Sequence, residues 1–162
     1  MCREGAFPTH IAGSADAAED AALRILRGAG QSAASLRRKL ERRGYAVDAA
    51  AEAVRRCASS GYVDDAAMAV SVAARHRRAG HGQARVAADL KAKGVAAEHI
   101  AEALDGQSDT EEAAAFAVAR RLWERSGAVD VRDQRARMRI AGALQRRGFS
   151  SSLVARVLRG LT

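Results

Sequence analysis

The chain has 162 residues, the length of one ordinary domain or of a few small modules in series. A single proline and 4% aromatic residues argue against a β-sandwich or barrel, whereas alanine, about a quarter of the residues, favours an all-α fold. The formal net charge of +8 indicates an anionic partner, either nucleic acid or a protein that carries it.

Apolar periodicity and helix-boundary residues predict nine helices in three groups of three. The predicted helices cover residues 16–28, 33–43 and 47–59, then 65–79, 82–93 and 96–104, and finally 110–126, 131–147 and 151–160. They define repeats at residues 15–61, 62–105 and 109–162, after a disordered segment at residues 1–14. Because each repeat is too small for a large core, we expect the repeats to support one another in an elongated, curved array.

A six-residue phrase ends the middle helix of each group. Its leucine, glycine and final apolar residue are Leu40, Gly44 and Tyr45, then Leu90, Gly94 and Val95, then Leu144, Gly148 and Phe149. Glycine readily adopts the left-handed backbone that follows a helix end, and the apolar residue after it packs back on the leucine in a Schellman motif. The phrase therefore predicts the same turn three times.

Side chains that can accept hydrogen bonds stand at the predicted helix starts. We expect N-caps at Ser32, Asp48, Asp65, Asp109 and Ser151. The adjacent Asp64 and Asp65 also suggest a metal or acid/base pair, but neighbouring residues at a helix start point in different directions, and no third ligand stands at useful spacing. We therefore interpret both aspartates as helix caps.

Basic residues are concentrated in the outer repeats. Residues 1–60 carry 10 basic against 7 acidic residues, residues 61–108 carry 6 of each, and residues 109–162 carry 11 against 6. We expect contacts with acidic protein surfaces or phosphates from Arg37, Arg38, Lys39, Arg42, Arg43, Arg132, Arg135, Arg139, Arg146 and Arg147. Steps of three and four residues place four of these on one stripe of the third repeat. The competing interpretation is a solvated helix face.

The sequence contains no recognisable catalytic, metal-binding or cofactor-binding constellation. Neither a phosphate loop nor a Ser-His-Asp or Cys-His set is discernible, and the histidines are too dispersed for a zinc site. Trp123, seven residues after Phe116, is expected to pack in a core rather than to stack on bases. We therefore expect a protein that is not an enzyme and that needs no metal and no cofactor.

Neither a membrane partner nor export is suggested by the sequence. Apolar runs fall short of the roughly 18 residues of a membrane span, and residues 1–15 lack the regions of a signal peptide. We expect a cytoplasmic monomer with reduced cysteines, in which Cys57 is a small buried apolar residue.

Three stretches, taken in order, resemble the signatures of one bacterial family. The first joins Ala22-Leu23-Arg24-Ile25-Leu26 to the segment from Ser32 to Tyr45. The second is Gly61-Tyr62-Val63-Asp64-Asp65, and the third runs from Leu144 to Ser150. From about Ala21 to Leu161 the chain resembles the regulatory protein RecX, the modulator of the RecA recombinase.

This resemblance implies three tandem three-helix units that bind in the groove of the RecA filament on single-stranded DNA. The ten basic residues named above are then the candidate contacts with RecA and DNA. The implied activity is a block to filament growth that lowers strand exchange, ATP hydrolysis and coprotease activity, and so affects homologous recombination, DNA repair and the SOS response. Two other classes of protein fit the residues: a small basic helical module that binds DNA or RNA directly, and a repeat scaffold for an acidic protein.

Overall fold

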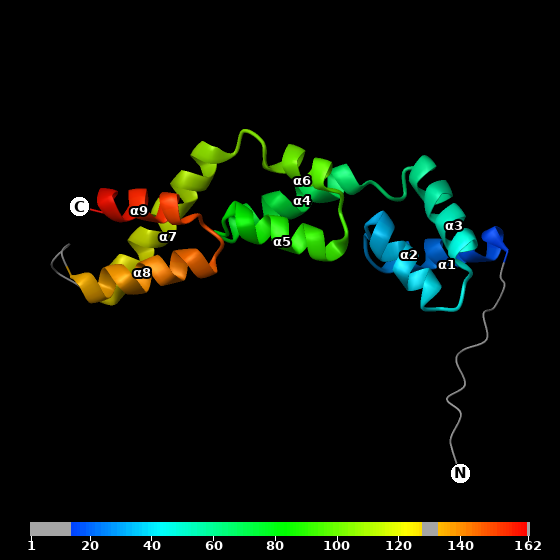
Figure 1. Cartoon of the computed structure of the whole chain (residues 1–162), viewed down its shortest axis with the longest axis horizontal. Coiled ribbons are helices and arrows are strands. Elements are labelled where there is room, and N and C mark those ends of the chain that lie inside the picture. Colours follow the sequence, from blue (N-terminus) through cyan, green and yellow to red (C-terminus); the bar gives the residue numbers. More distant parts are fainter. Residues whose placement is uncertain (1–13, 128–132, 162) are drawn as a thin grey trace, which may run out of the picture. The chain divides into compact units, whose positions relative to one another are not determined.

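The computed structural model describes residues 14–127 and 133–161, which form nine α-helices and no strand (Figure 1). The all-α prediction is confirmed. The segment predicted to be disordered, 1–14, lies outside the described residues except for Ser14, whose hydroxyl accepts a hydrogen bond from the N–H of Ala17. The helices are α1 (Ala15–Gly28), α2 (Ala33–Glu41), α3 (Val47–Ser59), α4 (Asp65–Arg78), α5 (Gln83–Lys93), α6 (Ala97–Leu104), α7 (Ser108–Ser126), α8 (Gln134–Arg146) and α9 (Ser151–Gly160).

Two compact units divide the described chain. The first comprises the described residues up to Met68 together with Lys93–Val95, and the second comprises Ala69–Ala92 together with the described residues from Ala96 onward. The boundary at Met68 falls inside α4, and the last residue of α5 belongs to the first unit. The division of the chain into three repeats at the predicted boundaries stays a prediction.

The core of the first unit combines small residues with two leucines. α1 packs on α3, and α2 packs on both. Ala18, Ala22 and Ala53 are fully buried in this core, and their small side chains allow the helix backbones to approach closely. Leu36 and Leu40 of α2 are also fully buried, so they supply much of the apolar area removed from water.

One core cluster of the second unit gathers on α7, α8 and α9, which pack on one another. Ala115 and Ala119 of α7 are fully buried beside Leu144 of α8. Phe116 and Trp123 are partly buried against the same cluster. The structure therefore agrees with the interpretation of these two aromatic residues as packing residues.

The glycine turns after α2 and α8 carry the two hydrogen bonds of a Schellman motif. After α2, the N–H of Gly44 donates to Glu41 at 2.9 Å and the N–H of Tyr45 donates to Leu40 at 3.3 Å. The turn after α8 has the same pair of bonds. The glycines of the three phrases have φ angles of +90°, +79° and +85°, at Gly44, Gly94 and Gly148. The apolar residues of the phrases are buried, except for the half-buried Tyr45.

Several helix starts differ from the predicted N-caps by one or two residues. Ser32 caps α2 as predicted, because its hydroxyl accepts a backbone N–H three residues on at 3.1 Å. Asp48 and Asp109 instead lie in the first turns of α3 and α7, where a carboxylate favours the positive end of the helix dipole. The cap of α9 is Ser150 and not the following serine, because the backbone leaves the extended conformation one residue earlier.

The N-terminus of α2 is held by residues that are distant in sequence but belong to the same unit. The hydroxyl of the buried Ser32 donates to the carbonyl of Lys93, and the carboxylate of Asp65 accepts the N–H of Ala33 at 2.9 Å. Asp64 lies at the start of its own helix, where it accepts a backbone N–H at 2.8 Å. The two adjacent carboxylates therefore accept hydrogen bonds at the starts of two different helices.

The N-terminus of α5 is held in a similar way within the second unit. The N–H of Gly82 donates to the carbonyl of Arg147 at 2.8 Å, and the carboxylate of Glu111 accepts the N–H of Gln83 at 2.7 Å. A Cβ atom at Gly82 would lie 2.3 Å from the carbonyl oxygen of Gly148. A carboxylate and a glycine turn from further along the chain thus support the start of α5, as they support the start of α2.

Asp65→Ala is expected to lower the free energy of unfolding by about 1–2 kcal/mol, because the N–H of Ala33 loses its acceptor. Urea denaturation followed by circular dichroism measures the change. Asp20→Ala is the matched control, since Asp20 is an exposed carboxylate of α1 with no side-chain partner among the described residues. The control is expected to stay within about 0.5 kcal/mol of the unsubstituted protein. Equal effects of the two substitutions would contradict a capping role for Asp65.

Cys57 is a free thiol of α3 that is 1% exposed. Burial raises the pKa of this thiol, and the nearby carboxylate of Glu19 adds to the effect. Because the thiolate is the reactive form, a Cys2→Ser variant is expected to react with a disulfide reagent at least about tenfold more slowly when folded than in guanidinium chloride. The folded rate should keep rising with pH after the rate of the unfolded thiol has levelled. Equal rates would show that Cys57 is accessible.

Candidate anion-binding surfaces

The basic residues predicted on α2 divide between contacts within the protein and an open surface. Arg37 pairs with Glu41 at 3.4 Å, and Arg38 donates to the carbonyl of Lys93 at 3.5 Å. The other three line an open hollow beside the loop between α1 and α2, and they are Lys39, Arg42 and Arg43. Arg42 and Arg43 are exposed and Lys39 is half-buried, whereas Arg37 and Arg38 are exposed but make the contacts named above.

On α8 the predicted arginines are exposed on the side away from the core. Arg135, Arg139 and Arg146 are exposed, while the apolar side of the same helix is buried. Arg132 lies outside the described residues. Arg137, which the sequence analysis did not select, is half-buried and donates to a carbonyl of α9 at 2.9 Å. It therefore ties two helices together, in contrast to its exposed neighbours.

Some arginines of the first unit have a clear role in holding the fold together. The guanidinium group of Arg56 lies 2.7 Å from Asp16, 3.1 Å from Glu19 and 2.8 Å from Glu52. It therefore joins α1 to α3. Hydrogen bonds from Arg55 and Arg56 lower the pKa of Glu52 and keep its carboxylate charged.

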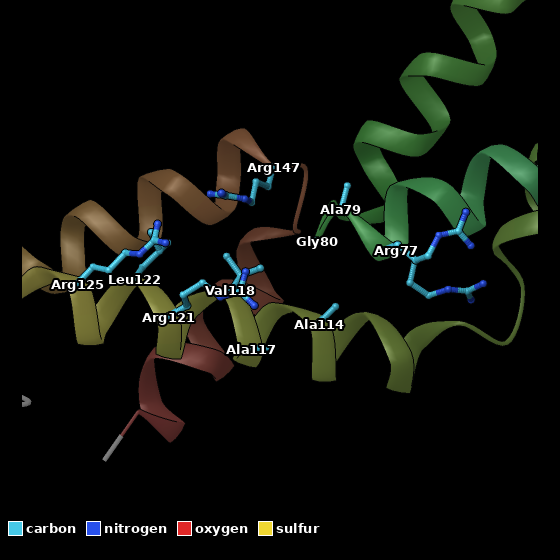
Figure 2. Close-up of a pocket in the computed structure, with 11 residues that line it drawn as sticks. Arg77, Ala79, Gly80, Ala114, Ala117, Val118, Arg121, Leu122, Arg125 and Arg147 are labelled. Atoms are coloured by element: carbon cyan, nitrogen blue, oxygen red, sulfur yellow. The ribbon is translucent and has the colours of Figure 1, made fainter.

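Arg147 belongs to a pocket of about 260 Å³ in the second unit, between the end of α4 and α7. Figure 2 shows Arg121 and Arg125 pointing from α7 toward the end of α8, where Arg147 lies. Gly80, two residues after the end of α4, lies between them and Arg77 in this view, and the Arg77 side chain extends away from them. Five arginines line the pocket in all: Arg77, Arg78, Arg121, Arg125 and Arg147. Of these, only Arg147 was predicted from the sequence as a candidate contact.

The missed arginines left a weak signal in the sequence. Arg77-Arg78 and Arg120-Arg121 are doublets, each followed within five residues by a glycine or a further arginine. The doublet at Arg77 belongs to a repeat with no net charge, and the charge count by repeat therefore concealed a local cluster. The four missed residues come from two helices that the sequence analysis did not place side by side.

Two of the histidines that were judged too dispersed for a zinc site form a hydrogen-bonded cluster in the second unit. The Nδ1 atoms of His76 and His81 are 2.9 Å apart, and Nε2 of His76 is 3.0 Å from a carboxylate oxygen of Asp89. Burial lowers the pKa of His81, and the charge of Arg85 lowers it further. A neutral His81 is compatible with a hydrogen bond between the two rings, because one nitrogen must accept.

The fold and these surfaces define the class of protein: an all-helical chain made of three-helix groups with arginine-rich surfaces. Among residues 14–127 and 133–161, no group of three histidines, cysteines or carboxylates is placed to hold a metal ion. None of the helices in these ranges has both the length and the apolar character needed to cross a bilayer.

Comparison with known proteins gives the family. A family model described as "RecX, second three-helix domain" matches residues 64–104. A second model, described as "RecX, third three-helix domain", matches residues 109–158. The chain is 37% identical to regulatory protein RecX of Trichlorobacter lovleyi over 139 residues, which cover 83% of this chain and 88% of that protein. It is 38% identical to RecX of Streptomyces coelicolor, over 85% of this chain and 73% of that protein. The chain belongs to the RecX family of regulatory proteins.

Solved structures support the same fold. The crystal structure of RecX from Lactobacillus salivarius superposes with a TM-score of 0.81 at 18% identity, covering 91% of this chain and 96% of that one. A second crystal structure of a regulatory protein RecX gives a TM-score of 0.75 at 19% identity, covering 88% of this chain and 70% of that one. The three-helix architecture is thus shared with these proteins at low sequence identity.

Proposed function

We propose that this protein binds the RecA filament on single-stranded DNA and inhibits its recombinase, ATPase and coprotease activities. The observation that carries the proposal is the similarity to regulatory RecX proteins over more than four fifths of the chain. Inhibition acts by binding and without catalysis, metal or cofactor. The protein acts as a cytoplasmic monomer, in homologous recombination, DNA repair and the SOS response.

Exposed arginines support the contacts that such binding requires. Arg135, Arg139 and Arg146 form no ion pair with any described residue, and they are exposed on one helix. Unpaired guanidinium groups can bind the carboxylates of RecA or the phosphates of the DNA within the filament. Lys39, Arg42 and Arg43 offer a second basic surface on α2.

A titration of the protein into cognate RecA, single-stranded DNA and ATP at low salt tests the proposal. ATP hydrolysis is expected to fall when the added protein is substoichiometric to RecA or comparable with it. An unchanged rate across the titration would refute the proposed inhibition. Light scattering of the same mixtures reports whether filaments stop growing.

Direct binding of DNA or RNA is the second candidate function, and the arginine pocket of Figure 2 favours it. Fluorescence anisotropy of a labelled oligonucleotide, without RecA, separates the two functions. A purely direct binder would bind naked nucleic acid with a steep salt dependence and would leave RecA hydrolysis unchanged on DNA in excess.

A further inference from the structure

The pocket between α4 and α7 concentrates positive charge that the fold itself does not use. Arg78, Arg121, Arg125 and Arg147 form no ion pair with a carboxylate of the described residues. Arg77 donates to the side chain of Gln107 at 3.1 Å, so its positive charge is also not neutralised. No acidic residue lines the pocket within the described part of the chain.

Some other arginines of the protein form ion pairs, in contrast to those of this pocket. Arg56 contacts three carboxylates, Arg156 pairs with Glu112 at 3.1 Å, and Arg75 lies 3.7 Å from Asp89. An anion bound in the pocket would be attracted by several positive charges at once. A helix C-terminus accounts for a basic residue at the end of α4, but Arg121 lies within α7, more than one turn before its end.

The floor of the pocket is apolar. Ala114, Ala117, Val118 and Leu122 of α7 line it together with the arginines. Val118 also lies close to the end of α4, because a Cβ atom at Gly80 would be 2.9 Å from its methyl carbon. A site with a cationic rim and an apolar floor suits a ligand with an anionic group on one side and a flat, less polar part on the other.

We propose that this pocket binds a nucleotide, with its phosphates on the arginines and its sugar or base on the apolar floor. Guanidinium groups match phosphate oxygens with pairs of N–H donors. Four unpaired guanidinium groups carry more positive charge than one carboxylate can neutralise. A polyphosphate or two successive phosphodiesters carry at least two negative charges and therefore match the pocket better. The nucleotide is either part of a nucleic-acid strand or a free nucleoside polyphosphate. This site requires no RecA, so its failure would leave the proposed function standing.

The test is binding of a fluorescently labelled dT oligonucleotide to the full chain at low salt, with ATP as competitor and no RecA present. Arg121→Gln/Arg125→Gln is expected to weaken binding about tenfold or more. The slope of log affinity against log salt concentration should also fall by about 0.7 for each phosphate that the variant no longer neutralises. Arg120→Gln/Arg159→Gln is the matched control, because both arginines are exposed, lie outside the pocket and remove the same charge. Circular dichroism checks that both variants keep their helices.

Competition by ATP would support a free nucleotide as the ligand, and binding of the oligonucleotide without such competition would support a strand. Equal affinities of the pocket variant and the control variant would overturn the proposal. The proposal would also be overturned if poly-glutamate bound in a way that required Arg121 and Arg125 while neither phosphate ligand did, since the pocket would then serve an acidic peptide.

Discussion

Gly82→Ala is expected to lower the free energy of unfolding by about 2–3 kcal/mol. The new Cβ atom would lie 2.3 Å from the carbonyl oxygen of Gly148, 2.5 Å from its carbonyl carbon and 2.6 Å from the nitrogen of Phe149. All three are backbone atoms, so no side-chain rotation relieves the overlap. The substitution must push the start of α5 away from the turn after α8, which also breaks the 2.8 Å hydrogen bond from Gly82 to Arg147.

Gly30→Ala is the matched control for this prediction. Gly30 also lies in a loop shortly before the second helix of its group, but a Cβ atom there meets nothing within 4 Å. Alanine at this position is expected to leave stability unchanged or to raise it by about 0.4–1 kcal/mol, because the unfolded chain becomes less flexible. Urea denaturation curves of the two variants decide the matter. Similar losses of stability in both variants would mean that the close backbone approach at Gly82 does not cause the destabilisation.

The starts of α2, α5 and α8 are held in two different ways. α2 begins at Ala33 and α5 at Gln83, both 11 residues before the glycine of their phrase, and each start is held by a later part of the chain. α8 begins at Gln134, 14 residues before Gly148, and Asp133 caps it by accepting a backbone N–H at 3.0 Å. The start of α8 is therefore capped by the residue directly before it and not by a later part of the chain.

The sequence predicted the features that depend on local interactions. The phrase that ends at Gly44 specifies its turn through hydrogen bonds between residues at most five apart, so its spacing predicts the geometry. The nine helices were predicted for the same reason, because apolar periodicity and breaks at glycine act over a few residues.

The features that the sequence did not predict depend on contacts between distant residues. Asp65 lies at the start of its own helix, as expected, but its carboxylate accepts the N–H of Ala33, 32 residues earlier, instead of an N–H of that helix. The arginine pocket is lined by Arg77, Arg121 and Arg147, which lie far apart in the sequence. No local sequence pattern indicates that these segments are close in space. A charge count by repeat averages over such clusters, and for that reason it favoured α8 and overlooked α4.

Replacing Arg135, Arg139 and Arg146 with glutamate is expected to raise the amount of protein needed for half-inhibition of RecA ATP hydrolysis by at least about tenfold. The three side chains are exposed on α8, and each reversal turns an attraction for an anionic surface into a repulsion. Because exposed substitutions change stability little, the helix content and unfolding midpoint should be close to those of the unsubstituted protein. The ATPase titration measures the half-inhibiting amount of protein. A circular dichroism melt measures the helix content and the unfolding midpoint.

A second triple variant distinguishes an effect of the position of these charges from an effect of the protein's net charge. Arg27, Arg120 and Arg159 are exposed arginines outside the candidate surfaces, and their replacement with glutamate changes the net charge by the same amount. Long-range attraction to a polyanion depends on total charge and is screened by salt, whereas a direct contact depends on which residues lie at the interface. If α8 contacts the filament, the first variant loses inhibition at physiological salt and the second retains it. Equal losses that disappear as salt is raised would assign the effect to net charge, and α8 would then be a solvated surface.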